Sequence, residues 1–126
     1  MIFVDSNVFM YVVGRPHPLR ENARAFFAEA LNEQSRLCTS AEVVQEMLHY
    51  YLPVGRIRTL DAALALIERT RTEVWPLELE DVTLARQLQE QLPALTARDL
   101  CHLACCRRRG VREIKTFDRA LGAVRV

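Results

Sequence analysis

Four carboxylates from distant parts of the chain are the residues best suited to do chemistry together. Each one follows an apolar run or lies early in a predicted helix: Asp5, Glu46, Asp99 and Asp118. Carboxylate oxygens are hard ligands, and they suit Mg²⁺ or Mn²⁺, which are hard cations that retain water. Two such ions held about 3.5–4 Å apart can activate a water and stabilise the leaving oxygen of a phosphodiester. Because gathered carboxylates repel one another without a cation, the pattern predicts an acidic metal site.

Other catalytic chemistries find little support in the sequence. It contains no Ser/His/Asp spacing typical of a triad, no glycine-rich phosphate loop and no His-x-x-x-His pair. The cysteines form no Cys-x-x-Cys pair, and the adjacent Cys105 and Cys106 would point in different directions on a helix. We therefore expect reduced cysteines that serve as small apolar side chains, not a zinc site or a disulfide framework.

Short apolar runs separated by helical periodicity predict strands that alternate with helices. The predicted strands cover residues 2–4, 37–39, 74–77 and 113–117. The predicted helices cover about residues 8–13, 18–31, 41–51, 57–67, 82–92 and 97–106, with a short final turn at 118–121. This alternation is typical of an α/β fold, a three-layer sandwich whose central, mainly parallel sheet is flanked by helices. Ligands of such sheets gather beyond the carboxyl ends of the strands, near a switch in strand order.

Each acid is predicted to lie near that edge of the sheet. Asp5 and Asp118 directly follow strands, Glu46 lies about one turn into a helix, and Asp99 lies in the first turn of another. Each also has a purely structural alternative. Asp5 and Asp118 have the position of helix caps, Thr96 and Asp99 have the spacing of a capping box, and Glu46 fits a solvated helix face. Convergence of all four depends on the strand order, which the sequence does not give.

Glu42 competes with Glu46 for the helical position in this set. The spacing of Thr39 and Glu42 fits a capping box, which would turn Glu42 back onto its own helix end. At about 100° per residue, Glu42 also lies almost opposite the apolar stripe of this helix, whereas Glu46 lies nearer its rim. We therefore predict that Glu46 faces the site.

Length and composition set wider bounds. The chain has 126 residues, which suits one domain over residues 1–126, and half of them are apolar, which supplies a core. Seventeen basic and sixteen acidic side chains give a formal net charge of +1, so any nucleic-acid surface must be local. The first apolar run is interrupted by an acid and lacks preceding basic residues, and no stretch reaches the roughly 20 apolar residues of a membrane helix. We expect a soluble, cytoplasmic protein with no membrane association.

Four segments together resemble the PIN domain family, and more narrowly the VapC-type toxins of prokaryotic toxin–antitoxin pairs. They are residues 2–8 (IFVDSNV), 39–48 (TSAEVVQEML), 97–104 (ARDLCHLA) and 116–118 (TFD). The resemblance implies a metal-dependent endoribonuclease that uses Mg²⁺, or Mn²⁺ as a substitute, and leaves a 5′-phosphate and a 3′-hydroxyl. It also implies a homodimer and a cognate VapB-like antitoxin that inserts a segment into the acidic groove.

By position, the resemblance assigns metal binding and catalysis to the four acids named above. It assigns to Asn7 and Thr116 the task of orienting those acids or a bound water. Two alternatives stay open. A haloacid-dehalogenase-like phosphatase would use Asp5 as nucleophile, but it needs a second Asp where Asn7 stands, and a suitably placed Lys is missing. A non-catalytic PIN-fold protein would only dock antitoxin or RNA.

Several further polar residues lie near the predicted site or at a helix end. His102 lies three residues after Asp99 on roughly the same helix face, and we expect it to serve in packing or at an interface. His49, one turn after Glu46, is interpreted as a polar residue beside the groove, and Arg98 as a possible substrate or antitoxin contact. Residues 107–109 are three arginines at a helix end, where cations interact favourably with the helix dipole, and we prefer that structural role to RNA steering.

Overall fold

Four short parallel strands form the sheet that positions the acids. The computed structural model describes all residues 1–126 and contains β1 (Ile2–Val4), β2 (Leu37–Ser40), β3 (Glu73–Trp75) and β4 (Glu113–Lys115). Their order in the sheet is β3-β2-β1-β4, and every neighbouring pair is parallel. The chain thus proceeds outward from β1 to β3 and then crosses to the other side of β1. The switch point lies between β1 and β4, and this is where a ligand site is expected.

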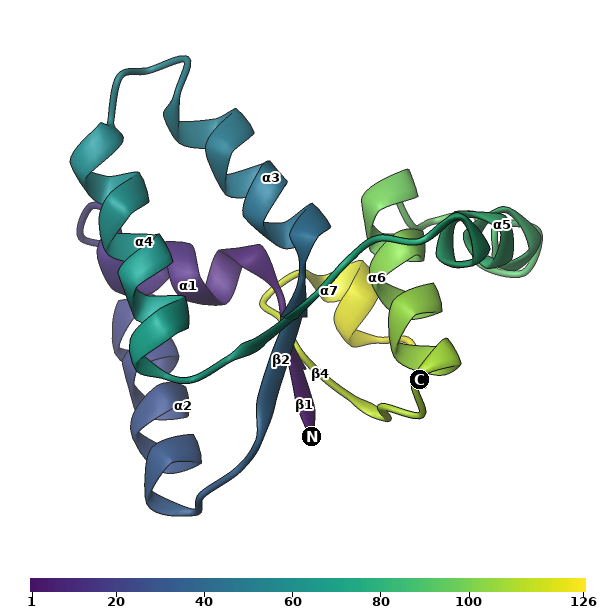
Figure 1. Cartoon of the computed structure of the whole chain (residues 1–126), viewed down its shortest axis with the longest axis horizontal. Coiled ribbons are helices and arrows are strands. Elements are labelled where there is room, and N and C mark those ends of the chain that lie inside the picture. Colours follow the sequence, from purple (N-terminus) through teal and green to yellow (C-terminus); the bar gives the residue numbers. More distant parts are fainter.

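Seven helices cover the two faces of this sheet. They are α1 (Ser6–Val13), α2 (Arg20–Asn32), α3 (Ala41–Tyr51), α4 (Ile57–Arg69), α5 (Leu79–Leu88), α6 (Ala97–Arg108) and α7 (Arg119–Gly122). Helices α1 to α4 gather on one side of the strands and α5 to α7 on the other (Figure 1). The predicted three-layer α/β architecture is therefore confirmed. None of the helices is long and apolar enough to cross a bilayer.

Each layer of helices has its own hydrophobic core. The larger cluster has 20 buried residues and includes Phe3, Phe9 and Met47 from β1, α1 and α3. The smaller cluster has seven buried residues and packs α5, α6 and α7 together through Leu88, Leu103 and Leu121. The cysteines are free, as predicted, and Cys38, Cys105 and Cys106 are buried as apolar side chains. These cores hold the helices whose first turns border the carboxyl edge of the sheet.

Several predicted boundaries differ from the structure for local reasons. The strand expected at 74–77 ends at Trp75, because Pro76 has no N–H to donate to a neighbouring strand. The strand expected at 113–117 ends at Lys115, because the next residues bond to side chains of the site instead. The helix expected to begin near residue 82 begins at Leu79, because Glu78 and Asp81 form a capping box there.

The predicted capping box between Thr39 and Glu42 is wrong. The residue that caps α3 is Ser40, whose Oγ accepts from the backbone N–H of Val43 at 3.3 Å. The hydroxyl of Thr39 instead donates to the Val4 carbonyl at 2.8 Å, tying β2 to β1. The helix therefore starts one residue later than the pattern suggests, and Glu42 is free to make a different contact.

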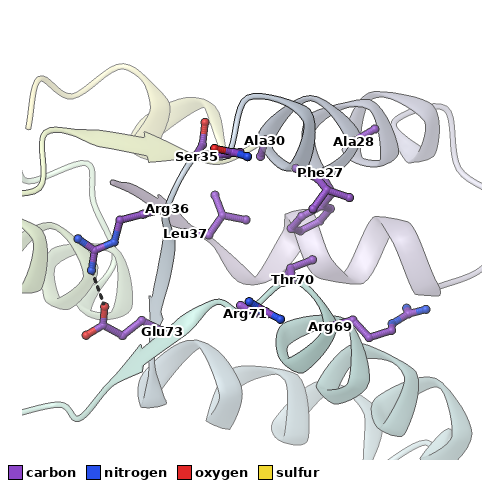
Figure 2. A pocket seen from close by; sticks show the side chains of 12 residues that line it. Phe27, Ala28, Ala30, Ser35, Arg36, Leu37, Arg69, Thr70, Arg71 and Glu73 are labelled. Carbon is purple, nitrogen blue, oxygen red and sulfur yellow. Dashed lines mark ion pairs between the residues drawn. The ribbon is translucent and has the colours of Figure 1, made fainter.

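A cavity of about 540 Å³ opens at the opposite, amino end of the sheet. It lies between the C-terminal parts of α2 and α4, with Phe27 and Leu37 on its apolar wall and three arginines around it (Figure 2). One of them, Arg36, has its Nη2 3.8 Å from a carboxylate oxygen of Glu73. This cavity contains none of the four acids, so it is separate from the predicted site.

Candidate metal and nuclease site

Asp5 is fixed at the centre of the site by two strong donors. It directly follows β1 and caps α1, where its Oδ1 accepts from the Ser6 backbone N–H at 2.7 Å. Its Oδ2 accepts from the Thr116 hydroxyl at 2.7 Å. The residue is only 4% exposed. The capping role foreseen for Asp5 is therefore real, and it leaves the carboxylate held in one orientation.

Asn7 and Thr116 tie the ends of β1 and β4 together beside that carboxylate. The Asn7 amide nitrogen donates to the Thr116 hydroxyl oxygen at 3.2 Å and lies 3.4 Å from Asp5 Oδ2. The Asn7 amide oxygen accepts from the Phe117 N–H at 3.1 Å, and Thr116 Oγ1 accepts from the Asp118 N–H at 3.0 Å. Both residues thus contact the acids that the sequence pattern associates with them, and they fix how β4 leads into α7.

Glu46 reaches the site from α3. Its Oε2 accepts from the Ser6 hydroxyl at 3.0 Å, while its Oε1 is buried without a hydrogen-bond partner. Burial raises the pKa of Glu46, but the neighbouring His102 and the Ser6 hydroxyl outweigh burial, so the pKa lies below its ordinary value. Glu42 lies elsewhere, with its Oε1 3.5 Å from Arg98 Nε. The structure therefore brings Glu46, and not Glu42, to Asp5.

Asp99 and Asp118 complete the acidic group. Asp99 lies in the first turn of α6, where its N–H donates to the Thr96 hydroxyl at 3.2 Å. Asp118 caps α7, with its Oδ1 accepting from the Leu121 N–H at 3.1 Å. Burial raises the pKa of Asp99, and the negative charges of Asp118 and Asp5 raise it further. Asp99 therefore shares one electrostatic environment with Asp118 and Asp5.

A pocket of about 410 Å³ joins these side chains. It is lined by Glu46, Asp99 and Asp118 together with residues 96–98. Arg98 is the one cation in its lining, and its guanidinium already lies beside Glu42. Three of the predicted acids thus line one pocket at the carboxyl edge of the sheet, and Asp5 adjoins it through the Ser6 hydroxyl, which contacts both Asp5 and Glu46. Asp99 and Asp118 lie outside the tight group of ligand atoms that Asp5 and Glu46 belong to, but their charges act on the same pocket.

His102 belongs to this site more closely than its expected packing role implies. It packs as predicted, with its ring 5.4 Å from that of Phe3, and it is 1% exposed. Its Nε2 also lies 3.8 Å from Asp5 Oδ1 and 3.6 Å from Glu46 Oε1. The signal available in the sequence was its position one helical turn after Asp99. Ser6 carried no comparable signal, although its hydroxyl links the same two acids.

The donor set at this point is suited to a divalent cation. One ligand atom from each of Asp5, Glu46 and His102 lies within 4.8 Å of the others. Buried polar atoms normally have hydrogen-bond partners, yet Glu46 Oε1 and His102 Nε2 have none. An unpaired carboxylate oxygen and an unpaired imidazole nitrogen 3.6 Å apart, beside the buried Asp5, form a donor set that fits a divalent cation.

The arginines of residues 107–109 are engaged elsewhere. Arg108 and Arg109 each donate to Asp81 Oδ1, at 2.7 and 3.0 Å, and Arg109 also donates to Glu78 at 2.8 Å. Arg107 donates to the backbone carbonyl of Arg125 at 3.0 Å. These arginines therefore make structural contacts, but the contacts are with acids at the start of α5 and a backbone carbonyl, whereas the sequence suggested an interaction with the helix dipole.

Comparison with known proteins agrees with this geometry. The PIN domain model matches residues 2–126. Ribonuclease VapC23 of Mycobacterium tuberculosis is 60% identical over 123 residues, which cover 98% of this chain and 97% of that protein. Ribonuclease VapC13 of the same organism is 38% identical and covers 94% of this chain. The crystal structure of M. tuberculosis VapC20, described as a sarcin-ricin loop cleaving toxin, superposes with a TM-score of 0.80 at 20% identity over the whole of both chains, which shows the shared fold. The chain belongs to the PIN domain family, among the VapC ribonucleases.

Proposed function

We propose that this protein is the toxin of a toxin–antitoxin pair and cleaves RNA as a metal-dependent endoribonuclease. The observation that carries the proposal is the gathering of Asp5, Glu46, Asp99 and Asp118 at the switch point of the sheet. Similarity to VapC ribonucleases across nearly the whole chain supports the reaction type. The alternative phosphatase would need a second Asp at position 7, where this chain has Asn7. The amide oxygen of Asn7 accepts from the Phe117 N–H, so this side chain braces the end of β4.

The acids would hold Mg²⁺ or Mn²⁺, the cations that carboxylate-rich sites favour. Such an ion, when bound, supplies positive charge that stabilises the phosphodiester transition state and lowers the pKa of a water. The protein contributes rigid placement. Ser6 and Thr116 fix both oxygens of Asp5, and Asn7 braces Thr116. A preorganised carboxylate needs little rearrangement when charge develops on the phosphate. We expect products with a 5′-phosphate and a 3′-hydroxyl.

The same proposal covers the partners and location of the protein. We infer a VapB-like antitoxin that covers the acidic pocket, a homodimer as the active assembly, and a cytoplasmic site of action. Similarity to named VapC proteins supports the antitoxin, and free, buried cysteines are in keeping with a reducing compartment. The neighbouring gene offers a direct check, because a short reading frame for a DNA-binding protein is expected beside this one.

RNA cleavage by the wild-type chain and by Asp5→Asn and Asp99→Asn tests the proposal, with and without EDTA. Both variants and the chelated wild type should be inactive, while Asp61→Asn, an exposed aspartate on α4, should cleave like the wild type. Full activity of either site variant, or activity in the chelator, would reject the mechanism. An intact chain that binds antitoxin or RNA but never cleaves would support the non-catalytic alternative.

A further inference from the structure

We infer that His102 is a direct ligand of the divalent cation through Nε2, beside Asp5 and Glu46, and that it makes the site favour Mn²⁺ over Mg²⁺. This inference rests on the proposed function and names a metal ligand outside the four acids. It begins from an anomaly of burial. His102 is 1% exposed, and neither of its ring nitrogens has a hydrogen-bond partner. Buried imidazole nitrogens are ordinarily satisfied, so the missing partner needs an explanation.

The unpaired Nε2 of His102 lies next to two carboxylates. Nε2 points toward Glu46 Oε1, 3.6 Å away, and that oxygen is itself buried and unpartnered. The same nitrogen is 3.8 Å from Asp5 Oδ1. Direct hydrogen bonds between nitrogen and oxygen are about 2.7–3.2 Å long, so both distances are too great for one. Two ligands that each lie about 2.1 Å from one ion are separated by roughly 3.0–4.2 Å, depending on the angle between them. Both measured distances fall in that range.

In the metal-free chain His102 favours the ionised form of Glu46, but an ion pair between a charged imidazole and the two acids explains the site less well than a ligand role does. A doubly protonated ring carries two N–H groups, and here both would be buried without an acceptor in hydrogen-bond range. In the ligand state the neutral ring keeps a single N–H and offers the Nε2 lone pair to the ion. The ligand state therefore leaves fewer polar groups unsatisfied among the same side chains.

The fold also positions His102 as a ligand should be positioned. It lies on α6 one turn after Asp99, so the two side chains share a face of that helix. Its ring packs on Phe3 of β1, at 5.4 Å between centroids and 40° between planes. Phe3 is followed two residues later by Asp5. A single strand and a single helix thus fix the histidine and two acids in one arrangement.

A nitrogen ligand has a chemical consequence for the choice of metal. Mg²⁺ takes oxygen ligands almost exclusively, whereas imidazole binds first-row transition metals more readily. A site made of carboxylates alone would discriminate little between Mg²⁺ and Mn²⁺. With His102 included, we expect Mn²⁺ to bind at least 10-fold more tightly than Mg²⁺.

Pulsed electron paramagnetic resonance of Mn²⁺ bound to the full chain tests the ligand directly, because a coordinated imidazole nitrogen modulates the electron spin echo. We expect nitrogen modulation in the wild type and its loss in His102→Gln. The matched control is His49→Gln, the same change at an exposed histidine on α3, which should keep the modulation. Bound Mn²⁺ without nitrogen modulation in the wild type, or equal modulation in His102→Gln, would overturn the inference.

Calorimetric titration with Mn²⁺ alone and with Mg²⁺ alone supplies a second readout. His102→Gln should lose about 10- to 100-fold in Mn²⁺ affinity and much less in Mg²⁺ affinity, which narrows the difference between the two metals. Melting curves check that the variant folds, and His102→Phe, which keeps a ring against Phe3, replaces it if it does not. Equal losses of Mn²⁺ and Mg²⁺ affinity in His102→Gln would contradict the claim that His102 makes the site favour Mn²⁺. Failure of the wild type to bind either metal would contradict the proposed function itself, whereas binding without a nitrogen ligand contradicts only the role of His102.

Discussion

Two buried aspartates show how differently this fold treats a carboxylate. Asp81 is fully buried, and the guanidiniums of Arg108 and Arg109 donate to it at 2.7 and 3.0 Å. Asp5 is 4% exposed, and its donors are the neutral N–H of Ser6 and hydroxyl of Thr116. The fold supplies a counter-charge to the first acid and places further acids around the second. Asp81 therefore completes a structural ion pair, while Asp5 has no arginine or lysine partner and lies among other acids.

The pKa values follow the same division. Burial raises the pKa of Asp81, but its arginine partners and the Glu78 N–H outweigh burial and lower that pKa to about 2. Asp99, near Asp5, has its pKa raised by burial and by the charges of Asp118 and Asp5. Acid burial alone does not distinguish a functional carboxylate from a structural one. We propose that the presence or absence of a built-in cation does.

The largest expected effect separates the two regions by activity. Asp5→Asn and Asp99→Asn should lower RNA cleavage by about 100-fold or more, because each removes charge from the proposed metal site. Asp81→Asn should cleave at nearly the wild-type rate when folded. Single-turnover cleavage at saturating Mn²⁺ measures the difference. Comparable losses of cleavage rate in all three variants would contradict the functional distinction between the acidic pocket and the Asp81 ion pairs.

The variant that keeps its activity, Asp81→Asn, should lose the most stability. Asp81→Asn removes the buried carboxylate that Arg108 and Arg109 share and leaves them the exposed acids Glu78 and Glu80. It should reduce the free energy of unfolding by about 2–4 kcal/mol in urea titrations. Asp61→Asn, at an exposed position, should change it by less than about 0.5 kcal/mol. A stability loss in Asp81→Asn no greater than in Asp61→Asn would mean that the ion pairs contribute nothing to the fold.

Divalent cations should stabilise one region and not the other. Mn²⁺ at about 100 times its dissociation constant should add about 2.7 kcal/mol to the wild type by mass action. Asp81→Asn should gain the same increment, whereas Asp5→Asn should gain little. Thermal melting with Mn²⁺ and with EDTA measures this, and superimposable wild-type curves would count against a cation in the acidic pocket.

The smallest effects concern pH in the absence of metal, and their signs differ. The lowered pKa of Asp81 contributes stability that is present above about pH 4 and is lost as the pH falls toward about 2. The raised pKa of Asp99 has the reverse sign, because its contribution is present at low pH and is lost as the pH rises through the folded-state value. In EDTA at neutral pH, Asp99→Asn should therefore be slightly more stable than the wild type. Equilibrium unfolding across this pH range measures both trends. A lower free energy of unfolding in Asp99→Asn than in the wild type would show that the ionised Asp99 carboxylate does not destabilise the folded state.

The positions of the four acids could be predicted from the sequence because they follow from local rules of helix and strand geometry. Helical geometry was enough to prefer Glu46 over Glu42, and strand ends were enough to place Asp5 and Asp118 at the same edge. The adjacency of β1 and β4 was out of reach, since it depends on a chain crossover and not on any local pattern. The bond between Thr116 and Asp5, 111 residues apart in sequence, depends on that adjacency.

The features that the sequence did not predict correctly depend on how elements pack against one another, which local sequence patterns do not specify. The capping box predicted for Thr39 failed because two neighbouring hydroxyls compete for one helix end, and the backbone position of Ser40 decided the outcome. Asp81 and its arginines lie 27 and 28 residues apart, on helices whose packing no periodicity specifies. His102 was assigned to packing, and its ring does pack. Which side of the ring meets the acids depends on how α6 is seated against β1.

Calorimetric titration of Mn²⁺ into the wild type, Asp5→Asn and Asp81→Asn tests the central claim most directly. We predict saturable binding to the wild type and to Asp81→Asn, and at least a 10-fold weaker affinity in Asp5→Asn. No saturable binding to the wild type, or equal affinity in wild type and Asp5→Asn, would contradict a divalent cation held by these acids.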